Sequence, residues 1–345
     1  MATRDTIVVG ASAGGVQALN KLVSDLPSDL PAAVFIVLHI PPDIPSLLPE
    51  ILSRNAQLEV AHAIDGEKIR GGKVYVAPPD HHLLIQDSHI ELVRGPKENL
   101  HRPSIDALFR SAARAASSRV IGVVLTGARD DGTIGMRAIK QRGGTAIIQD
   151  PAEAPFPSMP LSVMQEIRVD YSLPLQSIAP LLGRLSREKA EEEGRYPVPD
   201  EIDIESRIAE QRMEGDELLA FVEKLGKVSK LTCPDCHGAL WEIDDEQILR
   251  YRCHVGHAFS AESLHEGQTQ QLEIALWSAV RALEEKAVLA KRIVERSRKA
   301  NQARTARLFQ RRAEDAEAHG SMIRQLLLSA EKGDIGEPAL NTAND

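Results

Sequence analysis

The sequence predicts an α/β fold: a doubly wound, mostly parallel sheet with one antiparallel hairpin, followed by a small cysteine- and histidine-rich segment and a helical hairpin. Three observations support this prediction. Continuous apolar runs alternate with amphipathic stretches up to about residue 185. All three cysteines lie between residues 233 and 253. After residue 260, apolar residues recur every three or four positions in two long stripes. The 345 residues suffice for two or three domains.

In the first half of the chain, apolar runs predict buried strands and amphipathic stretches predict helices. The predicted strands are 6–10, 32–39, 73–78, 120–127 and 145–150, and the predicted helices are 14–27, 43–55, 104–116 and 131–144. Residues 82–95 alternate around Asp87-Ser88, which is typical of a hairpin. In the second half, one stripe includes Leu272, Val280 and Ala287, and the other includes Ala306 and Ala313. Two antiparallel helices would bury both stripes against each other.

These patterns divide the chain into segments. The predicted organisation is a first domain at 1–186, a charged linker at 187–205, a helix plus the cysteine-rich segment at 206–260, a long helical pair at 261–332 and a disordered tail at 333–345. The linker prediction rests on the charged, proline-interrupted composition of 187–205.

Composition excludes several classes of protein. The net charge is −9, from 41 basic and 50 acidic residues, which argues against a general nucleic-acid binder. The longest apolar runs, such as 32–38, are too short to cross a bilayer, so no membrane insertion is expected. No secretory pattern opens the chain, and three cysteines in one cluster favour metal binding over disulfides. A cytoplasmic location is expected.

The turn after the first strand, G-A-S-A-G at 10–14, matches the G-x-S-x-G pattern of a nucleophile elbow, which exposes a serine at the end of a strand. A plain tight glycine turn would also account for it. A dinucleotide site is disfavoured, because Ser12 stands where the second glycine of that fingerprint belongs. A phosphate-binding P-loop is excluded, because no Gly-Lys-Ser/Thr follows.

Two further polar residues follow other predicted strands. His39 ends the second apolar run, and Asp130 and Asp131 follow the strand at 120–127. Taken singly, the histidine could be a core residue and the acids helix N-caps. Together with Ser12 they stand at the carboxyl ends of parallel strands, where ligands bind in open α/β sheets. Ser12 would attack a carbonyl, His39 would carry its proton, and an aspartate would orient the imidazole.

The stretches VVGASAGG, VLHIPP, KVYVAPPDHHL, HRPSIDALF and GVVLTGARDDGTIGM occur in this order within residues 5 to about 183. They closely resemble the catalytic domain of the chemotaxis protein-glutamate methylesterase (CheB) family. The resemblance implies hydrolysis of glutamate methyl esters on the cytoplasmic helices of chemoreceptors, with release of methanol, and deamidation of glutamine there. It assigns the catalytic roles to Ser12, His39 and Asp131, because the family's aspartate directly precedes a glycine, here Gly132. No cofactor is expected for catalysis.

The chain departs from that family in three respects. Family members usually begin with a phosphorylatable receiver domain, and this chain begins at the esterase strand, so that switch is expected to be absent. A separate response regulator is then a candidate partner, beside chemoreceptors or similar helical signalling proteins. Ala13 replaces a frequent threonine, and Ala128 replaces a methionine. Both alanines can still offer backbone N–H groups to an oxyanion.

The second predicted site is a C-x2-C pair followed by C-x3-H. Cys233, Cys236, Cys253 and His257 would complete the tetrahedron of a closed, structural zinc site, so this segment is predicted to be zinc-ribbon-like. His254 competes as the fourth ligand, and His237 is a weaker candidate. Three ordinary buried cysteines would be the metal-free interpretation.

Several alternative functions stay open from the sequence. One is a non-catalytic signalling adaptor, and another is a serine esterase that acts on a different carbonyl substrate. Nucleic-acid binding through the ribbon is a third, and the basic stripe at 291–312 is compatible with it, although a solvated helix face explains that stripe equally well. The C-terminal module could dock a partner or the receptor bundle, or cover the active site.

Overall fold

The structure is a computed structural model that describes residues 2–192, 194–212, 215–244 and 248–333. The predicted tail at 333–345 lies outside the described residues, except for residue 333. Two compact units make up the chain, Met1–His265 and Glu266–Asp345.

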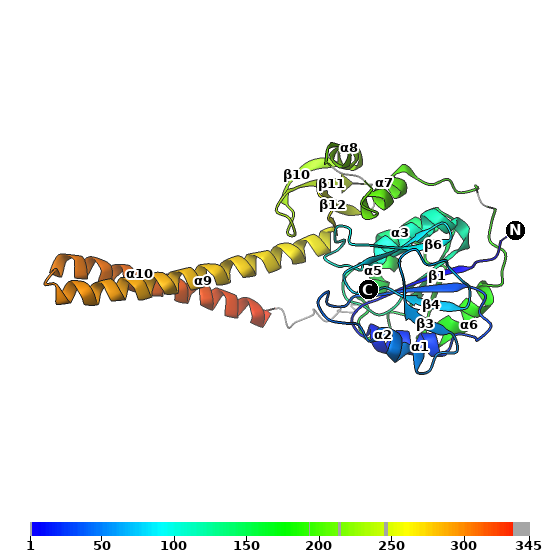
Figure 1. Ribbon diagram of the computed structural model, residues 1–345, viewed down its shortest axis with the longest axis horizontal. Helices are drawn as coiled ribbons and strands as arrows, with labels where there is room; N and C mark the ends of the chain where they lie inside the picture. Colours follow the sequence, from blue (N-terminus) through cyan, green and yellow to red (C-terminus); the bar gives the residue numbers. More distant parts are fainter. Residues whose placement is uncertain (1, 193, 213–214, 245–247, 334–345) are drawn as a thin grey trace, which may run out of the picture. The chain divides into compact units, whose positions relative to one another are not determined.

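The centre of the first unit is a seven-stranded, all-parallel sheet (Figure 1). Its strands are β1 (Thr6–Ala11), β2 (Ala33–Leu38), β3 (Glu59–His62), β4 (Lys73–Val76), β7 (Val120–Val124), β8 (Thr145–Gln149) and β9 (Tyr171–Leu173), in the order β3-β4-β2-β1-β7-β8-β9. Residues on β1, β2 and β7 are buried on both faces, which explains their uninterrupted apolar runs. β1, the middle strand, has β2 and β7 as its neighbours.

Helices cover both faces of this sheet. They are α1 (Gly15–Ser24), α2 (Leu48–Ser53), α3 (Ile105–Ala116), α4 (Thr133–Gln141), α5 (Ser158–Glu166) and α6 (Leu175–Leu185), with a 3-10 turn at Ser117–Arg119. Alternate β1 residues face the two cores: Ile7 packs in a cluster with residues of α1 and α6, and Val8 in a cluster with residues of α3 and α4. Figure 1 shows α1, α2 and α6 on one side of the strands and α3 on the other.

The antiparallel hairpin is β5 (His82–Gln86) with β6 (His89–Val93), and it turns at Asp87-Ser88 as predicted. The predicted α/β fold class, with its parallel sheet and its hairpin, is therefore confirmed. The structure adds α5 and α6, which were not predicted, and one predicted helix begins later than expected. α2 begins only at Leu48, because Pro45 interrupts the stretch that we expect to be helical from residue 43.

The rest of the first unit is a pair of helices and a four-stranded antiparallel sheet. These are α7 (Asp200–Ala209), α8 (Gly215–Leu225), β10 (Lys227–Thr232), β11 (Ala239–Asp244), β12 (Leu249–Cys253) and β13 (Ala258–Ser260). α7 begins inside the segment predicted as a linker at 187–205. It packs against α3, with Ile202 in the core and Glu205 buried. Apolar and ion-pair contacts thus order the end of that charged segment.

The second unit is a helical hairpin, as predicted. α9 spans Ala261–Lys299, with its first residues in the first unit, and α10 spans Ala303–Gly333. The predicted stripes bury Val280, Ala287, Ala290 and Val294 on α9, and Ala306, Ala313, Ala316 and Leu327 on α10. Leu272 is an error of the prediction, since 60% of it is exposed. Lys291–Glu317 and Arg324–Glu284 ion pairs join the two antiparallel helices. Among the described helices, none combines the length and apolarity that a bilayer crossing requires.

Candidate active site and metal centre

The turn that carries Ser12 is short and tightly packed. Gly14 adopts a left-handed φ of 72°, and α1 begins at the next residue. A Cβ atom added to Gly15 would lie 2.8 Å from Cβ of Ala11, so only glycine lets the helix start this close to the strand. The Ser12 N–H donates to the carbonyl oxygen of Thr126, 3.1 Å away. The loop after β7 thereby holds the serine turn in place.

The structure brings Ser12, His39 and Asp131 together. His39 follows β2, which is adjacent to β1, and its backbone N–H donates to the carbonyl oxygen of Ala11. Its Nδ1 lies 3.1 Å from Ser12 Oγ, and its Nε2 lies 2.7 Å from Asp131 Oδ2. With the ring proton on Nε2, the imidazole donates to the carboxylate and accepts from the serine hydroxyl. This is the hydrogen-bond chain that a serine nucleophile needs.

The carboxylate of Asp131 lies at the N-terminus of α3 and caps that helix. It accepts hydrogen bonds from the N–H groups of Ile105, at 2.8 Å, and Asp106, at 3.2 Å, and from Ser104 Oγ, at 3.0 Å. Burial opposes ionisation of Asp131, but the hydrogen bond and charge of His39 outweigh it and hold the pKa of Asp131 well below its usual value. Asp131 is therefore an anion at neutral pH, and it can stabilise a protonated His39.

A second buried carboxyl, that of Asp106, caps α4 in turn. Its Oδ1 accepts from the N–H groups of Gly132, at 3.0 Å, and Gly135, at 2.6 Å. Burial, together with the charge of Asp131, raises the pKa of Asp106 well above its usual value. Asn99 Nδ2 donates to both carboxyl groups, at 2.8 Å from Asp106 and 3.0 Å from Asp131. The candidate site is thus a network that links the ends of two helices.

The position of the two acids after the strand at 120–127 does not by itself distinguish Asp130 from Asp131 as the partner of the histidine. In the structure, the carboxylate that contacts His39 belongs to Asp131. Asp130 lies close by, and burial raises its pKa to about 6 against an opposing hydrogen bond from Ser260. Position directly before Gly132 therefore identifies the aspartate that faces the histidine.

A second histidine, His101, stacks on His39. Their ring centroids are 3.6 Å apart and the planes differ by 12°. Burial, with the adjacent His39, lowers the pKa of His101 to about 3, so it stays neutral and fixes the His39 ring plane without adding a charge. Sequence reasoning missed His101, Asn99, Ser104 and Asp106 as site residues. Three of them lie in the stretch HRPSIDALF, and the resemblance of that stretch to the family is the signal that could have identified them.

The surroundings of Ser12 offer donors for an oxyanion. A Cβ atom added to Gly127 would lie 3.0 Å from Cβ of Ser12, so the loop after β7 runs directly beside the serine. Within the described part of the chain, the N–H groups of Ala13 and Ala128 have no hydrogen-bond acceptor. Ala13 follows Ser12 and Ala128 follows Gly127, so their N–H groups are candidate donors for a tetrahedral intermediate.

Two buried histidines predict acid sensitivity of the fold. Burial lowers the pKa of His82, which donates from Nε2 to the carbonyl oxygen of Pro96, and also that of His101. Below about pH 6.5 the unfolded chain therefore binds protons that the folded protein does not. Each such proton lowers the free energy of unfolding by about 1.4 kcal/mol per pH unit, and for His101 this continues down to about pH 3.

The measurement is urea unfolding at pH 7 and pH 5 for the wild type and for His101→Gln. We expect a shallower pH dependence in the variant, by about one proton. The difference between the two proteins isolates His101 from the other titrating groups. Equal slopes would contradict the neutral, buried state of His101.

The predicted metal ligands also lie together. The ligand atoms of Cys233, Cys236, Cys253 and His257 all lie within 4.8 Å of one another. Cys236 Sγ is 3.6 Å from Cys253 Sγ, and His257 Nδ1 is 3.5 Å from Cys253 Sγ. Tetrahedral Zn–S bonds of about 2.3 Å place two sulfurs about 3.8 Å apart, so this arrangement fits zinc.

The competing histidines are not part of this group. The ring of His254 lies against Gly238, where an added Cβ would be 2.3 Å from its Cε1 atom. His237 adopts a left-handed φ of 60° in the turn after Cys236, and its N–H donates to the carbonyl oxygen of Cys233. Among the described residues, His257 is the histidine whose ring nitrogen groups with the three sulfurs.

Comparisons with known proteins agree on one family. A family model described as CheB methylesterase matches residues 7–182. A protein of Leptospira interrogans named "Putative protein-glutamate methylesterase/protein-glutamine glutaminase" is 39% identical over 189 residues, which cover 54% of this chain and 98% of that protein. A relative from Anaeromyxobacter dehalogenans, protein-glutamate methylesterase/protein-glutamine glutaminase 4, is 37% identical over 190 residues, and the match spans only 53% of its length.

Among solved structures, the crystal structure of the Thermotoga maritima CheB methylesterase catalytic domain is similar, with a TM-score of 0.51 and 36% sequence identity. The similarity covers 52% of this chain and 98% of that one. The loops that carry Ser12, His39 and Asp131, and all of the sheet except Thr6, fall within the family match.

Proposed function

Because this chain belongs to the CheB methylesterase family, we propose that it is a protein-glutamate methylesterase that acts on the cytoplasmic helices of chemoreceptors. The observation that carries the proposal is the position of His39 between Ser12 Oγ, at 3.1 Å, and the Asp131 carboxylate, at 2.7 Å. A cytoplasmic location follows from this substrate.

In the proposed reaction, Ser12 Oγ attacks the ester carbonyl carbon while His39 Nδ1 takes the hydroxyl proton. Asp131 accepts from Nε2–H and stabilises the imidazolium. The N–H groups of Ala13 and Ala128 stabilise the oxyanion. The tetrahedral intermediate collapses, the C–O bond to methoxide breaks, and His39 returns the proton to release methanol. Water, deprotonated by His39, then attacks the acyl-serine carbonyl. The C–O bond to Ser12 breaks, His39 returns the proton to Ser12 Oγ, and a free glutamate leaves.

The same groups would deamidate a glutamine side chain. The bond that breaks is then C–N, and His39 protonates the departing ammonia instead of methanol. The acyl-serine intermediate is identical, so the two activities would depend on the same three residues. Relatives whose names combine methylesterase and glutaminase support both reactions as a proposal for this chain.

The test is methanol release from a methylated cytoplasmic fragment of a chemoreceptor, with ammonia release from the glutamine form of the fragment as the second readout. Labelling of Ser12 by a fluorophosphonate probe reports the activated serine without any natural substrate. Labelling without methanol release would instead favour an esterase for another carbonyl substrate. Absence of both would favour a non-catalytic adaptor.

We further propose that Cys233, Cys236, Cys253 and His257 hold one structural zinc ion. With four protein ligands, a bound zinc ion has no open position for substrate. It would cross-link the segment that contains β10 to β13, which we call the ribbon. The convergence of the four ligand atoms, with Cys233 and Cys253 buried, supports this assignment.

Metal content provides a test with a matched control. The purified protein is expected to contain about one zinc ion per chain, and chelation is expected to lower its thermal stability. His257→Gln should lose most of its zinc in the presence of a chelator, because it removes a ligand, whereas His254→Gln should retain it. Equal loss in both variants would contradict the choice of His257, and metal-free wild-type protein would contradict the site.

A further inference from the structure

Asn99 stands between the candidate catalytic aspartate and the C-terminal part of the first unit. It lies in the loop between β6 and α3, it is buried, and its φ of 51° is left-handed. Asparagine, unlike most residues, adopts this conformation readily. His101, which stacks on His39, belongs to the same loop. The position of this loop therefore bears on both His39 and Asp131.

The direction of the Asn99 amide is determined by its neighbours. Its Oδ1 accepts from the backbone N–H of Ser260, at 2.9 Å, and from Ser263 Oγ, at 3.0 Å. A backbone N–H can only donate, so the oxygen must face Ser260. The NH2 group then faces Asp131 and Asp106 and donates to both. If the amide were rotated by 180°, its NH2 group would face the Ser260 N–H, and its oxygen would face the carboxyl groups of Asp131 and Asp106.

The two serines lie at the junction of β13 and α9 and are hydrogen-bonded to each other. Ser260 ends β13 and caps α9, since its Oγ accepts the N–H of Ser263 at 3.0 Å. β13 also lies along the loop of Asn99: the Asn99 N–H donates to the carbonyl oxygen of Ala258, and the Ala258 N–H donates to that of Lys97. The ribbon therefore contacts both the backbone and the side chain of Asn99.

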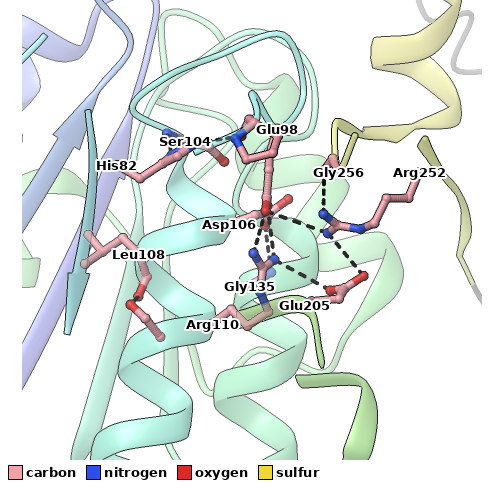
Figure 2. Close-up of polar contacts among 12 residues, drawn as sticks. His82, Glu98, Ser104, Asp106, Leu108, Arg110, Gly135, Glu205, Arg252 and Gly256 are labelled. Atoms are coloured by element: carbon pink, nitrogen blue, oxygen red, sulfur yellow. Dashed lines mark hydrogen bonds and ion pairs between the residues drawn. The ribbon is translucent and has the colours of Figure 1, made fainter. Parts of the chain in front are cut away.

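A buried group of charges attaches the ribbon to this loop (Figure 2). Glu98, beside Asn99, pairs with Arg110 of α3 at 2.6 Å and with Arg252 of β12 at 3.7 Å. Glu205 of α7 pairs with Arg250 at 2.7 Å and with Arg252 at 3.5 Å. These charged side chains are all buried, and Arg252 pairs with carboxylates of both the loop and α7. Buried ion pairs therefore support the contact of the ribbon with the loop of Asn99, beside the hydrogen bonds.

We propose that Asn99 is a positioning residue for Asp131, and that the ribbon sets the direction of the Asn99 amide through Ser260 and Ser263. The C-terminal segment then supports the catalytic site through Asn99, which holds the carboxylate that orients His39. This inference rests on the proposed serine-hydrolase function. It has the opposite sign to autoinhibition, because weakening the contact lowers activity.

The test measures the rate of Ser12 labelling by a fluorophosphonate probe in full-length protein, in the wild-type and Asp131→Asn backgrounds. Asn99→Gly removes the amide and tolerates the left-handed backbone. Asn99→Asp keeps the size and the acceptor toward Ser260 but places a third carboxyl against Asp131 and Asp106. Ser263→Ala removes one donor on the ribbon side.

We expect Asn99→Gly to slow labelling about 10- to 100-fold, as for loss of a hydrogen bond to a charged group. Asn99→Asp should slow it at least as much, and Ser263→Ala about 3- to 10-fold. In the Asp131→Asn background, each of these effects should shrink to within about twofold, because a residue that acts through Asp131 has nothing left to position.

Three results would overturn the inference. One is unchanged labelling in Asn99→Gly, and another is a loss of the same size in both backgrounds, which would indicate a merely structural role. The third is wild-type protein that is not labelled, because then no activated serine exists and the proposed hydrolase fails as well. Labelling without methanol release from a receptor fragment refutes only the substrate, and the comparison of the variants still decides the role of Asn99.

Discussion

Replacing Ser12 with alanine is expected to lower methanol release by about 10^4- to 10^6-fold, the loss seen when the nucleophile of a triad is removed. The physical reason is that His39 Nδ1, 3.1 Å from Ser12 Oγ, is left without a hydroxyl to activate, so the acyl-serine cannot form. The assay is methanol release from the methylated receptor fragment, with deamidation measured in parallel.

Ser53→Ala is the matched control, because Ser53 is an exposed residue at the end of α2 whose hydroxyl donates to the carbonyl oxygen of Glu50 in the same helix. We expect it to retain wild-type activity. Because one acyl-serine serves both reactions, methanol release and deamidation should disappear together in Ser12→Ala. Substantial methanol release from that variant would refute the assigned nucleophile.

Asp131→Asn is expected to lower the rate by about 10^3- to 10^4-fold while the protein stays folded. The Asn oxygen can take the place of Oδ1, which accepts from the Asp106 N–H and from Ser104 Oγ. The new amide NH2 group then stands in the place of Oδ2, toward His39 Nε2. A donor at that position requires Nε2 to be the acceptor, so the ring proton moves to Nδ1. The imidazole then cannot take the proton of Ser12.

The matched control for this change is Asp130→Asn in the neighbouring residue. Asp130 does not contact His39, and burial already raises its pKa to about 6. Its variant should lie within about threefold of the wild-type rate. An equal loss in both variants would show that the carboxylates act through local charge instead of through a hydrogen bond to the imidazole.

The fold and the three triad candidates could be predicted because strand ends are visible in sequence. β1, β2 and β7 are uninterrupted apolar runs, and a parallel sheet brings the residues that follow them to one edge. The boundary of α7 could not be predicted in the same way. Glu205 contributes to a charged, linker-like composition, yet it is buried against Arg250 and Arg252, and sequence does not show which charges are paired.

The contacts that support the site were beyond sequence reasoning for a related reason. Asn99 and Ser260 are 161 positions apart, one in a loop and the other at the end of the three-residue strand β13, so no periodicity indicates a shared environment. His254 and His257 both follow Cys253 at short spacing, so the sequence does not decide between them. The positions of their rings in the structure do. Leu272 fits the apolar period of α9, but its side chain is exposed in the structure.

The capping of α3 by Asp131 has a practical consequence for finding physiological partners. In many enzymes a catalytic side chain can be truncated with no harm to the scaffold, which makes it convenient for preparing inert bait. Here truncation of Asp131 would also strip the start of α3 of its acceptor, so a weakened interaction with a receptor could reflect a damaged scaffold. Ser12, whose side chain caps no helix, is therefore the better position for a substrate-trapping variant in pull-down experiments.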